Sequence, residues 1–194
     1  KAKATDMSKV LDLIVELAIF EKEPSAVEIS VDDLIRYGIG SSSDFDCFVA
    51  EADNDIVGIA LVYTRFSTWK GRVLHLEDLI VSKNMRGKGV GSALLDRVVK
   101  HASDLKVKRV SWEVLDWNTL AIQFYEAKGA DVKRDWDVVH LNEEGIKKYL
   151  SKFDSAIANV QVIHGPERFG DVPHSQASIE KAIKLLNYKP THNF

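Results

Sequence analysis

The sequence predicts an α/β fold with a mixed, splayed central sheet flanked by helices and a short C-terminal appendage. Two observations support this prediction. Segments with the alternation or β-branched composition of strands are interspersed with segments whose apolar residues recur at helical spacing. In addition, residues 74–102 read as a strand, a glycine-rich turn and a helix in direct succession. A mixed order of this kind is typical of an α/β domain.

The expected elements follow from this periodicity in chain order. The first half contains a short strand before Thr5, helices at residues 8–21 and 31–37, and strands near 48–52, 56–64 and 73–81. The second half contains a long helix after the glycine-rich turn, a strand at 109–115, a short helix around Tyr125 and a last strand near 136–141.

The glycine-rich turn runs Arg86-Gly87-Lys88-Gly89-Val90-Gly91. Glycines at alternate positions let the backbone approach a ligand, and the amide N–H groups at a helix start favour an anion, so a diphosphate fits there. The spacing lacks the third glycine of G-x-G-x-x-G, and no Gly-Lys-Ser/Thr closes a Walker-type loop. An ordinary glycine-rich turn is the alternative interpretation.

A second motif lies at residues 114–130 (VLDWNTLAIQFYEAKGA). Asn118 or Thr119 is placed to cap a short helix, and Gly129 is placed to end it. The apolar residues between them, which include Tyr125, form one part of that helix.

The two motifs, in this order, resemble those of the GNAT acetyltransferase superfamily. Within it the chain is similar to the spermidine/spermine acetyltransferase group and most similar to the branch that acetylates thialysine. The segments that carry this resemblance are VELAIFE (15–21), FVAE (48–51), STWKG (67–71), LEDLIV (76–81) and VLDWN (114–118). The resemblance implies an acetyltransferase domain over residues 1–152, with acetyl-CoA as cosubstrate.

The resemblance also implies which residues contact acetyl-CoA. Asn118 touches the coenzyme, Tyr125 faces its sulfur, and the backbone N–H of Leu79 or Ile80 polarises the thioester carbonyl. The full implied set is Leu79, Ile80, Val81, Arg86, Gly87, Lys88, Gly89, Val90, Gly91, Ser92, Asn118 and Tyr125.

Amine acetylation requires a base, because a lysine-like ammonium with a pKa near ~10 must lose a proton before it attacks a thioester. Glu77 and Asp78, in the strand before the turn, are the candidates, with ordinary strand-end charges as the alternative. In the family the residue at Glu77 is the proposed base, and the one at Asp78 helps to hold the cation. Tyr125 is the expected general acid toward the thiolate, whose reference pKa near ~8.5 is close to that of phenol; a core aromatic is the alternative.

Substrate recognition is predicted at Glu21, Trp69 and Asp78, which match positions that contact the amine in the family. Carboxylates and an aromatic face suit an alkylammonium, whereas a solvated acidic loop is the plainer interpretation. The polyamine enzymes carry an acidic residue just before the tryptophan of STWKG, and this chain has Ser67 in that segment. This departure weakens a polyamine assignment.

Composition indicates an enzyme of the cytoplasm with no membrane or nucleic-acid partner. The 194 residues are 45% hydrophobic with a net charge of −3, and no basic stripe or membrane-length apolar run is present. The single cysteine, Cys47, precedes an expected strand and is expected in the core. No spacing typical of a metal site occurs, so we expect no metal.

Residues 153–194 form the expected appendage. The string GDVPHSQASIEKAIKLLNYKPTHNF resembles the C-terminal part of nucleotide-sugar epimerases, and Ser175 is placed to cap a helix through Leu186. No dinucleotide fingerprint or Tyr-x-x-x-Lys pair accompanies it, so an independent epimerase is not expected.

The favoured function is therefore transfer of acetyl from acetyl-CoA to a small primary amine, thialysine-like, lysine-like or a polyamine, by direct attack in a ternary complex. A protein lysine or N-terminal acetyltransferase and a non-catalytic acyl-CoA binding module are the alternatives. The resemblance also implies a homodimer.

Overall fold

The computed structural model describes residues 1–150 and 184–185. Its contacts divide the chain into two compact units, residues 1–132 and 133–194, and each is described by itself. The sequence-based boundary after Lys152 stays a prediction, and the epimerase-like residues lie almost entirely outside the described part of the chain.

The first unit is built on a mixed sheet with the order β1-β2-β3-β4 in the described residues. Its strands are β1 (Asp46–Ala52), β2 (Asp55–Ser67), β3 (Gly71–Val81) and β4 (Val110–Ser111). The first three strands pair antiparallel, and β4 runs parallel to β3. Asp53 and Asn54 both have positive φ, the backbone that a tight two-residue hairpin between β1 and β2 requires.

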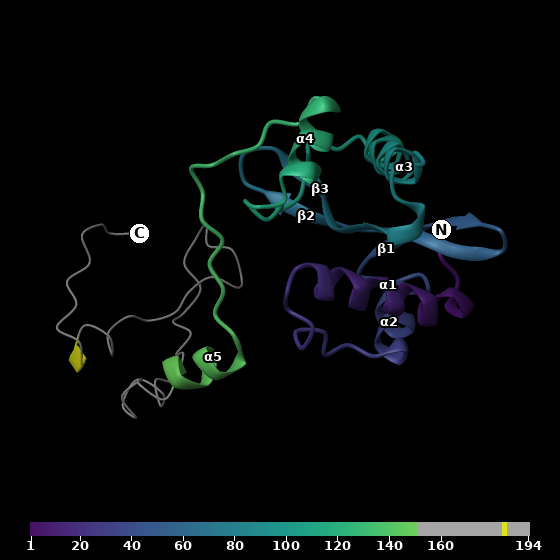
Figure 1. The fold of residues 1–194 in the computed structure, drawn as a ribbon. Coiled ribbons are helices and arrows are strands. Elements are labelled where there is room, and N and C mark those ends of the chain that lie inside the picture. The colour runs from purple at the N-terminus through teal and green to yellow at the C-terminus, as the bar shows by residue number, and fades with distance from the viewer. Residues whose placement is uncertain (151–183, 186–194) are drawn as a thin grey trace. The chain divides into compact units, whose positions relative to one another are not determined.

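Helices cover both faces of this sheet (Figure 1). On one face lie α1 (Met7–Phe20) and α2 (Val31–Gly38), and on the other lie α3 (Val90–Asp104) and α4 (Thr119–Ala127). Ser30 begins α2 through a reciprocal capping box with Asp33.

A separate apolar core fills each face. The core beneath α1 and α2 consists of Met7, Val10, Leu13, Leu34, Cys47, Ile59 and Ile80. The core beneath α3 and α4 consists of Phe48, Ala60, Val62, Leu74, Leu76, Leu94, Leu95, Val98, Ala102 and Tyr125. The predicted fold class, a mixed sheet flanked by helices, is thus confirmed.

Three predicted strands differ from the observed structure. The opening strand before Thr5 is replaced by a short 3₁₀ helix (Ala4–Asp6), and Ala2 donates one backbone hydrogen bond of 2.8 Å to Cys47. The strand predicted at 109–115 pairs only at Val110 and Ser111, because the chain then turns away from β3. The expected splay of the sheet is the separation of β3 and β4 beyond this short pairing.

The last predicted strand, at residues 136–141, is wrong. A strand needs a neighbour for its backbone hydrogen bonds and an apolar face that becomes buried. Residues 136–141 belong to the second unit, and Trp136 and Val139 are 71% and 87% exposed. The β-prone composition of the segment is therefore not matched by a partner in the described residues.

The second unit contains a helix that the sequence analysis did not predict, α5 (Glu143–Leu150). The side chain of Asn142 accepts a 2.8 Å hydrogen bond from the backbone N–H of Gly145, which caps the helix. Acidic residues occupy its first turn and lysines its last, as the helix dipole favours. Within the described residues, no helix has the length and apolar character needed to span a membrane.

Candidate active site

A cavity of about 270 Å³ opens where β3 and β4 part. The two strands pair at Leu74 with Val110 and at His75 with Ser111, after which β3 continues to Val81 without β4 beside it. Nine residues singled out from the sequence line this cavity: Glu21, Glu77, Asp78, Leu79, Ile80, Val81, Arg86, Asn118 and Tyr125.

An irregularity in β3 gives the cavity its acidic character. The pairing with β2 shifts between Leu61 and Val62, which lie opposite Asp78 and Leu76, so Glu77 is an extra residue in β3. Leu76 and Leu79 both pack in the core beneath α3 and α4. The two residues between them therefore belong to the opposite face of the sheet, as a β-bulge allows.

The two carboxylates have different environments. Asp78 is largely buried, and burial, followed by the charges of Glu77 and Glu21, raises its pKa to about 6. Burial also raises the pKa of Glu21, at the C-terminal end of α1. The side chain of Glu77 is 52% exposed, and its Oε2 lies 3.5 Å from Nε2 of His75. The site thus holds a protonatable buried carboxyl beside a solvent-accessible one.

Tyr125 reaches the cavity from α4, on the other side of the opening. Its ring packs against Trp112 and Phe124, with centroid distances of 5.0 and 5.2 Å. Burial raises the pKa of the Tyr125 phenol to about 12. The phenol is therefore protonated over the whole neutral range and available as a hydrogen-bond donor.

Asn118 fixes the start of α4 and with it the position of Tyr125. Its Oδ1 accepts a 3.3 Å hydrogen bond from the backbone N–H of Ala121. Ala121 and Tyr125 are one helical turn apart and both line the cavity. The cap predicted at Asn118 or Thr119 is thus made by Asn118.

Beyond Arg86, the glycine-rich turn lies outside the lining of the cavity, at the N-terminus of α3. Gly87 and Gly89 have φ of 75° and 85°, a left-handed backbone that strains other residues, and a Cβ at either position would meet nothing within 4 Å. Gly89 is the N-cap of the 15-residue α3 and has no side chain to satisfy the first-turn N–H groups. This open, positively polarised helix end fits a diphosphate. The remaining residues predicted here are Lys88, Val90, Gly91 and Ser92, all in the same turn and first helical turn.

Arg86 joins the turn to β3 and α1. Its Nε donates a 2.8 Å hydrogen bond to the carbonyl of Val81, and its guanidinium lies 3.3 Å from Oε1 of Glu16. Oε1 of Glu16 also accepts a 3.0 Å hydrogen bond from the backbone of Lys83. Glu16 was not singled out from the sequence, where it reads only as a polar position on α1.

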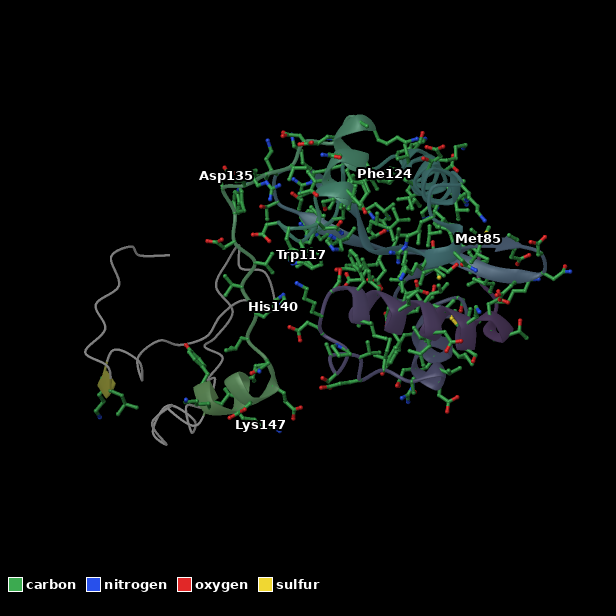
Figure 2. The ribbon with its side chains drawn as sticks, in the orientation of Figure 1. Met85, Trp117, Phe124, Asp135, His140 and Lys147 are labelled. Atoms are coloured by element: carbon green, nitrogen blue, oxygen red, sulfur yellow. The ribbon has the colours of Figure 1, made fainter. Side chains whose placement is uncertain are left out.

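An aromatic pair joins the end of α1 to the β4–α4 connection. Phe20, the last residue of α1, lines the cavity, and Trp117, labelled in Figure 2, precedes Asn118. The rings of Phe20 and Trp117 lie 5.5 Å apart, and Nζ of Lys22 lies 4.9 Å from the Trp117 ring. Lys22 follows the end of α1 with φ of 68°, a conformation in which glycine is the usual residue. A cation thus lies over the Trp117 ring, one residue after the cavity-lining Glu21.

Trp69 is the predicted substrate residue that does not line the cavity. It lies in the turn between β2 and β3 and is 78% exposed. Glu77 is six residues beyond Gly71, where β3 begins, which is about 20 Å along a strand at about 3.3 Å per residue. Its role in substrate recognition stays a prediction.

Cys47 was expected in the core and is buried there. Burial, with a smaller contribution from Asp78, raises the pKa of its thiol to about 12. The thiol is therefore protonated at neutral pH, and a protonated thiol is a poor nucleophile.

The comparisons with known proteins agree with this geometry. Residues 11–130 match the acetyltransferase (GNAT) family. A thialysine N-epsilon-acetyltransferase from Bos taurus is 39% identical over 163 residues, which cover 78% of this chain and 96% of that protein. A human spermidine/spermine N(1)-acetyltransferase-like protein 1 is 32% identical over 74% of this chain but over only 22% of its own length.

Solved structures share the fold. An integron cassette protein from the mobile metagenome of V. cholerae superposes with a TM-score of 0.64 at 24% identity, over 78% of this chain and 95% of that one. An aminoglycoside acetyltransferase from a soil metagenomic sample has a TM-score of 0.59 at 20% identity, over 73% and 91%. The chain belongs to the acetyltransferase (GNAT) family and is an N-acetyltransferase; enzymes of this family use acetyl-CoA as cosubstrate.

Proposed function

We propose that this enzyme transfers the acetyl group of acetyl-CoA to the side-chain amine of a small lysine-like or thialysine-like molecule. One observation carries the proposal. Three carboxylates, those of Glu21, Glu77 and Asp78, line the same cavity as the buried phenol of Tyr125. Carboxylates bind and deprotonate an ammonium, and a phenol serves a departing thiolate.

The chain's own residues suit acetyl-CoA at this site. The N-terminus of α3 and the glycines at 87 and 89 would hold the diphosphate, and Arg86 lies beside that turn. When bound, acetyl-CoA supplies the thioester carbon that the amine attacks. Beyond His75, the edge of β3 that faces away from β2 has no paired strand, and it would offer the backbone N–H of Leu79 or Ile80 to the thioester oxygen.

Proton transfers follow from the two ends of the cavity. Asp78 and Glu21 hold the ammonium, and Glu77 accepts one of its protons, directly or through a water. The free amine then forms the bond to the acetyl carbon as the carbon–sulfur bond breaks, and Tyr125 gives its proton to the sulfur. The second nitrogen proton replaces the proton lost by Tyr125, so that one proton in total is released through Glu77.

The raised pKa of Tyr125 is compatible with this role. Burial disfavours every anion in the same place, so the thiolate that forms beside Tyr125 also becomes more basic than a thiolate in water. The difference between the pKa of the phenol and that of the thiol is thereby reduced. The neutral phenol donates a hydrogen bond to the sulfur before the proton is transferred.

The cation over Trp117 supports a lysine-like substrate over a polyamine. Lys22 follows the cavity-lining Glu21 in sequence, and its positive charge attracts a carboxylate and repels a second ammonium. A lysine-like molecule carries both an amine for the acidic site and a carboxylate for Lys22. A polyamine carries cations at both ends. The thialysine N-epsilon-acetyltransferase relatives support the same choice.

Several features of the proposal rest on the sequence and its resemblances. We propose a homodimer in the cytoplasm, with no metal, nucleic acid or membrane partner in the reaction. The epimerase-like residues 153–194 are proposed to be a non-enzymatic appendage.

Release of coenzyme A tests the proposal directly. Purified protein is given acetyl-CoA with thialysine, lysine, ornithine, spermidine, short diamines or a lysine-containing peptide, each over a range of concentrations. The proposal expects the highest kcat/KM for thialysine or lysine. A preference for spermidine or for the peptide would overturn the substrate assignment, and no turnover with any amine would overturn the proposed function.

A further inference from the structure

A row of polar side chains crosses the sheet next to Glu77. The pairing registers place Tyr63 of β2 opposite His75 of β3, and His75 opposite Ser111 of β4. Residues paired in this way lie on the same face of a sheet. The rings of Tyr63 and His75 are in contact, with centroids 5.1 Å apart.

Two members of this row interact with Glu77. Nε2 of His75 lies 3.5 Å from Oε2 of Glu77. Burial, and then the nearby Glu77 carboxylate, raise the pKa of the Tyr63 phenol. The imidazole is 8% exposed, whereas the Glu77 side chain is 52% exposed. A half-exposed carboxylate thus lies beside a buried imidazole.

The far side of the imidazole is unsatisfied. Within the described residues, Nδ1 of His75 and Oγ of Ser111 are both buried and have no hydrogen-bond partner. Buried polar groups of this kind are nearly always paired, by protein or by an ordered water. Since the two residues are register partners, one ordered water that accepts from the Ser111 hydroxyl and donates to Nδ1 would satisfy both.

Such a hydrogen bond determines the tautomer of His75. If Nδ1 accepts, the ring proton of a neutral imidazole is on Nε2, which faces Glu77. Burial lowers the pKa of His75 and outweighs the opposite influence of Glu77 and Glu113; Arg65 on β2 acts in the same direction as burial. His75 is therefore neutral near pH 7 and donates one proton toward the carboxylate.

We propose that His75, with Tyr63, is a positioning residue for Glu77: the two side chains hold the carboxylate at the cavity, and Ser111 sets the tautomer that lets His75 donate. This inference rests on the proposed function, in which Glu77 accepts a proton from the amine. It assigns no substrate contact to His75.

Three variants test the proposal through catalysis. His75→Phe keeps a buried ring and removes the donor, His75→Gln restores an amide donor, and Tyr63→Phe removes only a hydroxyl. We expect His75→Phe to lower kcat by about tenfold, a part of the 10²–10⁴ that a general base contributes. We expect His75→Gln to stay within about threefold of wild type. The KM for acetyl-CoA should not change in any of them.

The pH profile separates positioning from a structural effect. A carboxylate that loses a hydrogen-bond donor holds its proton more tightly, so the rising limb of kcat/KM should move to higher pH in His75→Phe and Tyr63→Phe. In a Glu77→Gln background the same substitutions should add no further loss. Tyr37 is an exposed residue of α2, away from the site. Tyr37→Phe makes the same chemical change as Tyr63→Phe and serves as the control. A wild-type kcat and an unmoved limb in both variants would overturn the proposal.

A spectroscopic test needs no turnover. Nitrogen-15 NMR of histidine-labelled protein, with His75 assigned from His75→Gln, should show a neutral ring protonated at Nε2 near pH 7. Ser111→Ala should shift the ring toward a mixture of tautomers. A ring protonated at Nδ1, or at both nitrogens, would overturn the assignment. If the enzyme showed no turnover while this signature was present, the proposed function would fail and the arrangement around His75 would stand.

Discussion

Glu77 and Asp78 are neighbours in sequence and lie on the same face of the sheet, because β3 has one residue more than β2 where they pair. In a regular strand successive side chains point to opposite faces, and one of the two would lie in the core beneath α3 and α4. The bulge instead brings both carboxylates to the cavity. The acidic site therefore depends on a single inserted residue in the hydrogen-bond ladder.

Asp78 should leave a signature in the pH dependence of substrate capture. Its pKa of about 6 means that it is neutral below this pH and ionised above it. We therefore expect kcat/KM for a cationic amine to rise as the pH passes about 6. Asp78→Asn should raise the KM for the amine by about tenfold and remove this step. The charges of Glu77 and Glu21 also act on Asp78, so the pH at which kcat/KM rises reflects all three carboxyls. A rise of wild-type size in Asp78→Asn would contradict the assignment to Asp78.

Glu77 should affect kcat more than KM. Replacement by glutamine preserves the size of the side chain and removes the base, so we expect kcat to fall by about 100-fold and its rising limb against pH to flatten. Steady-state rates at saturating acetyl-CoA measure this. Asp78→Asn is the matched variant, with its main effect on KM. If kcat of Glu77→Gln depended on pH as in wild type and reached the same value, Glu77 would not be the base.

The buried charge of Asp78 should reduce stability at neutral pH. Its pKa is higher in the folded protein than the unfolded value of 3.8. The protonated carboxyl therefore contributes its full stability below pH 3.8, and the free energy of unfolding falls as the pH rises through about 6. We expect Asp78→Asn to raise the free energy of unfolding at pH 7.5 by up to about 3 kcal/mol, and to bring no gain at pH 4.

Urea titration of both proteins at the two pH values measures the difference. Asp12→Asn removes an exposed carboxylate on α1 and should change little at either pH. Equal effects of Asp78→Asn at both pH values would mean that the charge is not the cause. The active site would then carry no electrostatic cost in stability.

Tyr125 should be required for the step in which the thiolate leaves. Tyr125→Phe preserves the packing of the ring against Trp112 and Phe124 and removes only the hydroxyl. We expect kcat to fall by about 100-fold with the KM for acetyl-CoA within a few fold of wild type. Tyr37→Phe again controls for the chemical change. Turnover at the wild-type rate with both substrates saturating would remove Tyr125 from the reaction.

The sequence predicted most of this arrangement because its signals are local. Periodicity located the long strands and four helices of the first unit, and the glycines at 87 and 89 and the cap at Asn118 marked the ends of helices. Positions that depend on pairing were not predicted. The row of Tyr63, His75 and Ser111 becomes visible only when the registers of three strands are known.

The errors have the same origin. Residues 136–141 have the composition of a strand, but a strand forms only where another strand accepts its hydrogen bonds. Similarly, the strand at 109–115 ends after Ser111, where the chain leaves β3 and opens the cavity. Composition alone cannot report the presence or absence of a neighbour that is distant in sequence.

Lys22 should determine whether the enzyme prefers an amino acid or a diamine. Lysine and 1,5-diaminopentane differ only by the carboxylate of lysine, so the ratio of their kcat/KM values isolates recognition of that group. An exposed charge pair at about 4 Å contributes roughly 1 kcal/mol, or about fivefold. We therefore expect Lys22→Gln to reduce the preference for lysine by about fivefold, and Lys22→Glu to reduce it further.

Salt and a second lysine provide the controls for this prediction. Raising the ionic strength to about 1 M shortens the screening length to about 3 Å, so the wild-type preference should fall toward that of Lys22→Gln. Lys9→Gln makes the same change of charge near the opposite end of α1, where Lys9 pairs with Asp55, and should leave the ratio unchanged. If the ratio of kcat/KM for lysine and 1,5-diaminopentane were identical in wild type and Lys22→Gln, Lys22 would not recognise the carboxylate of lysine. The selectivity between the two amines would then have to come from the shape of the cavity.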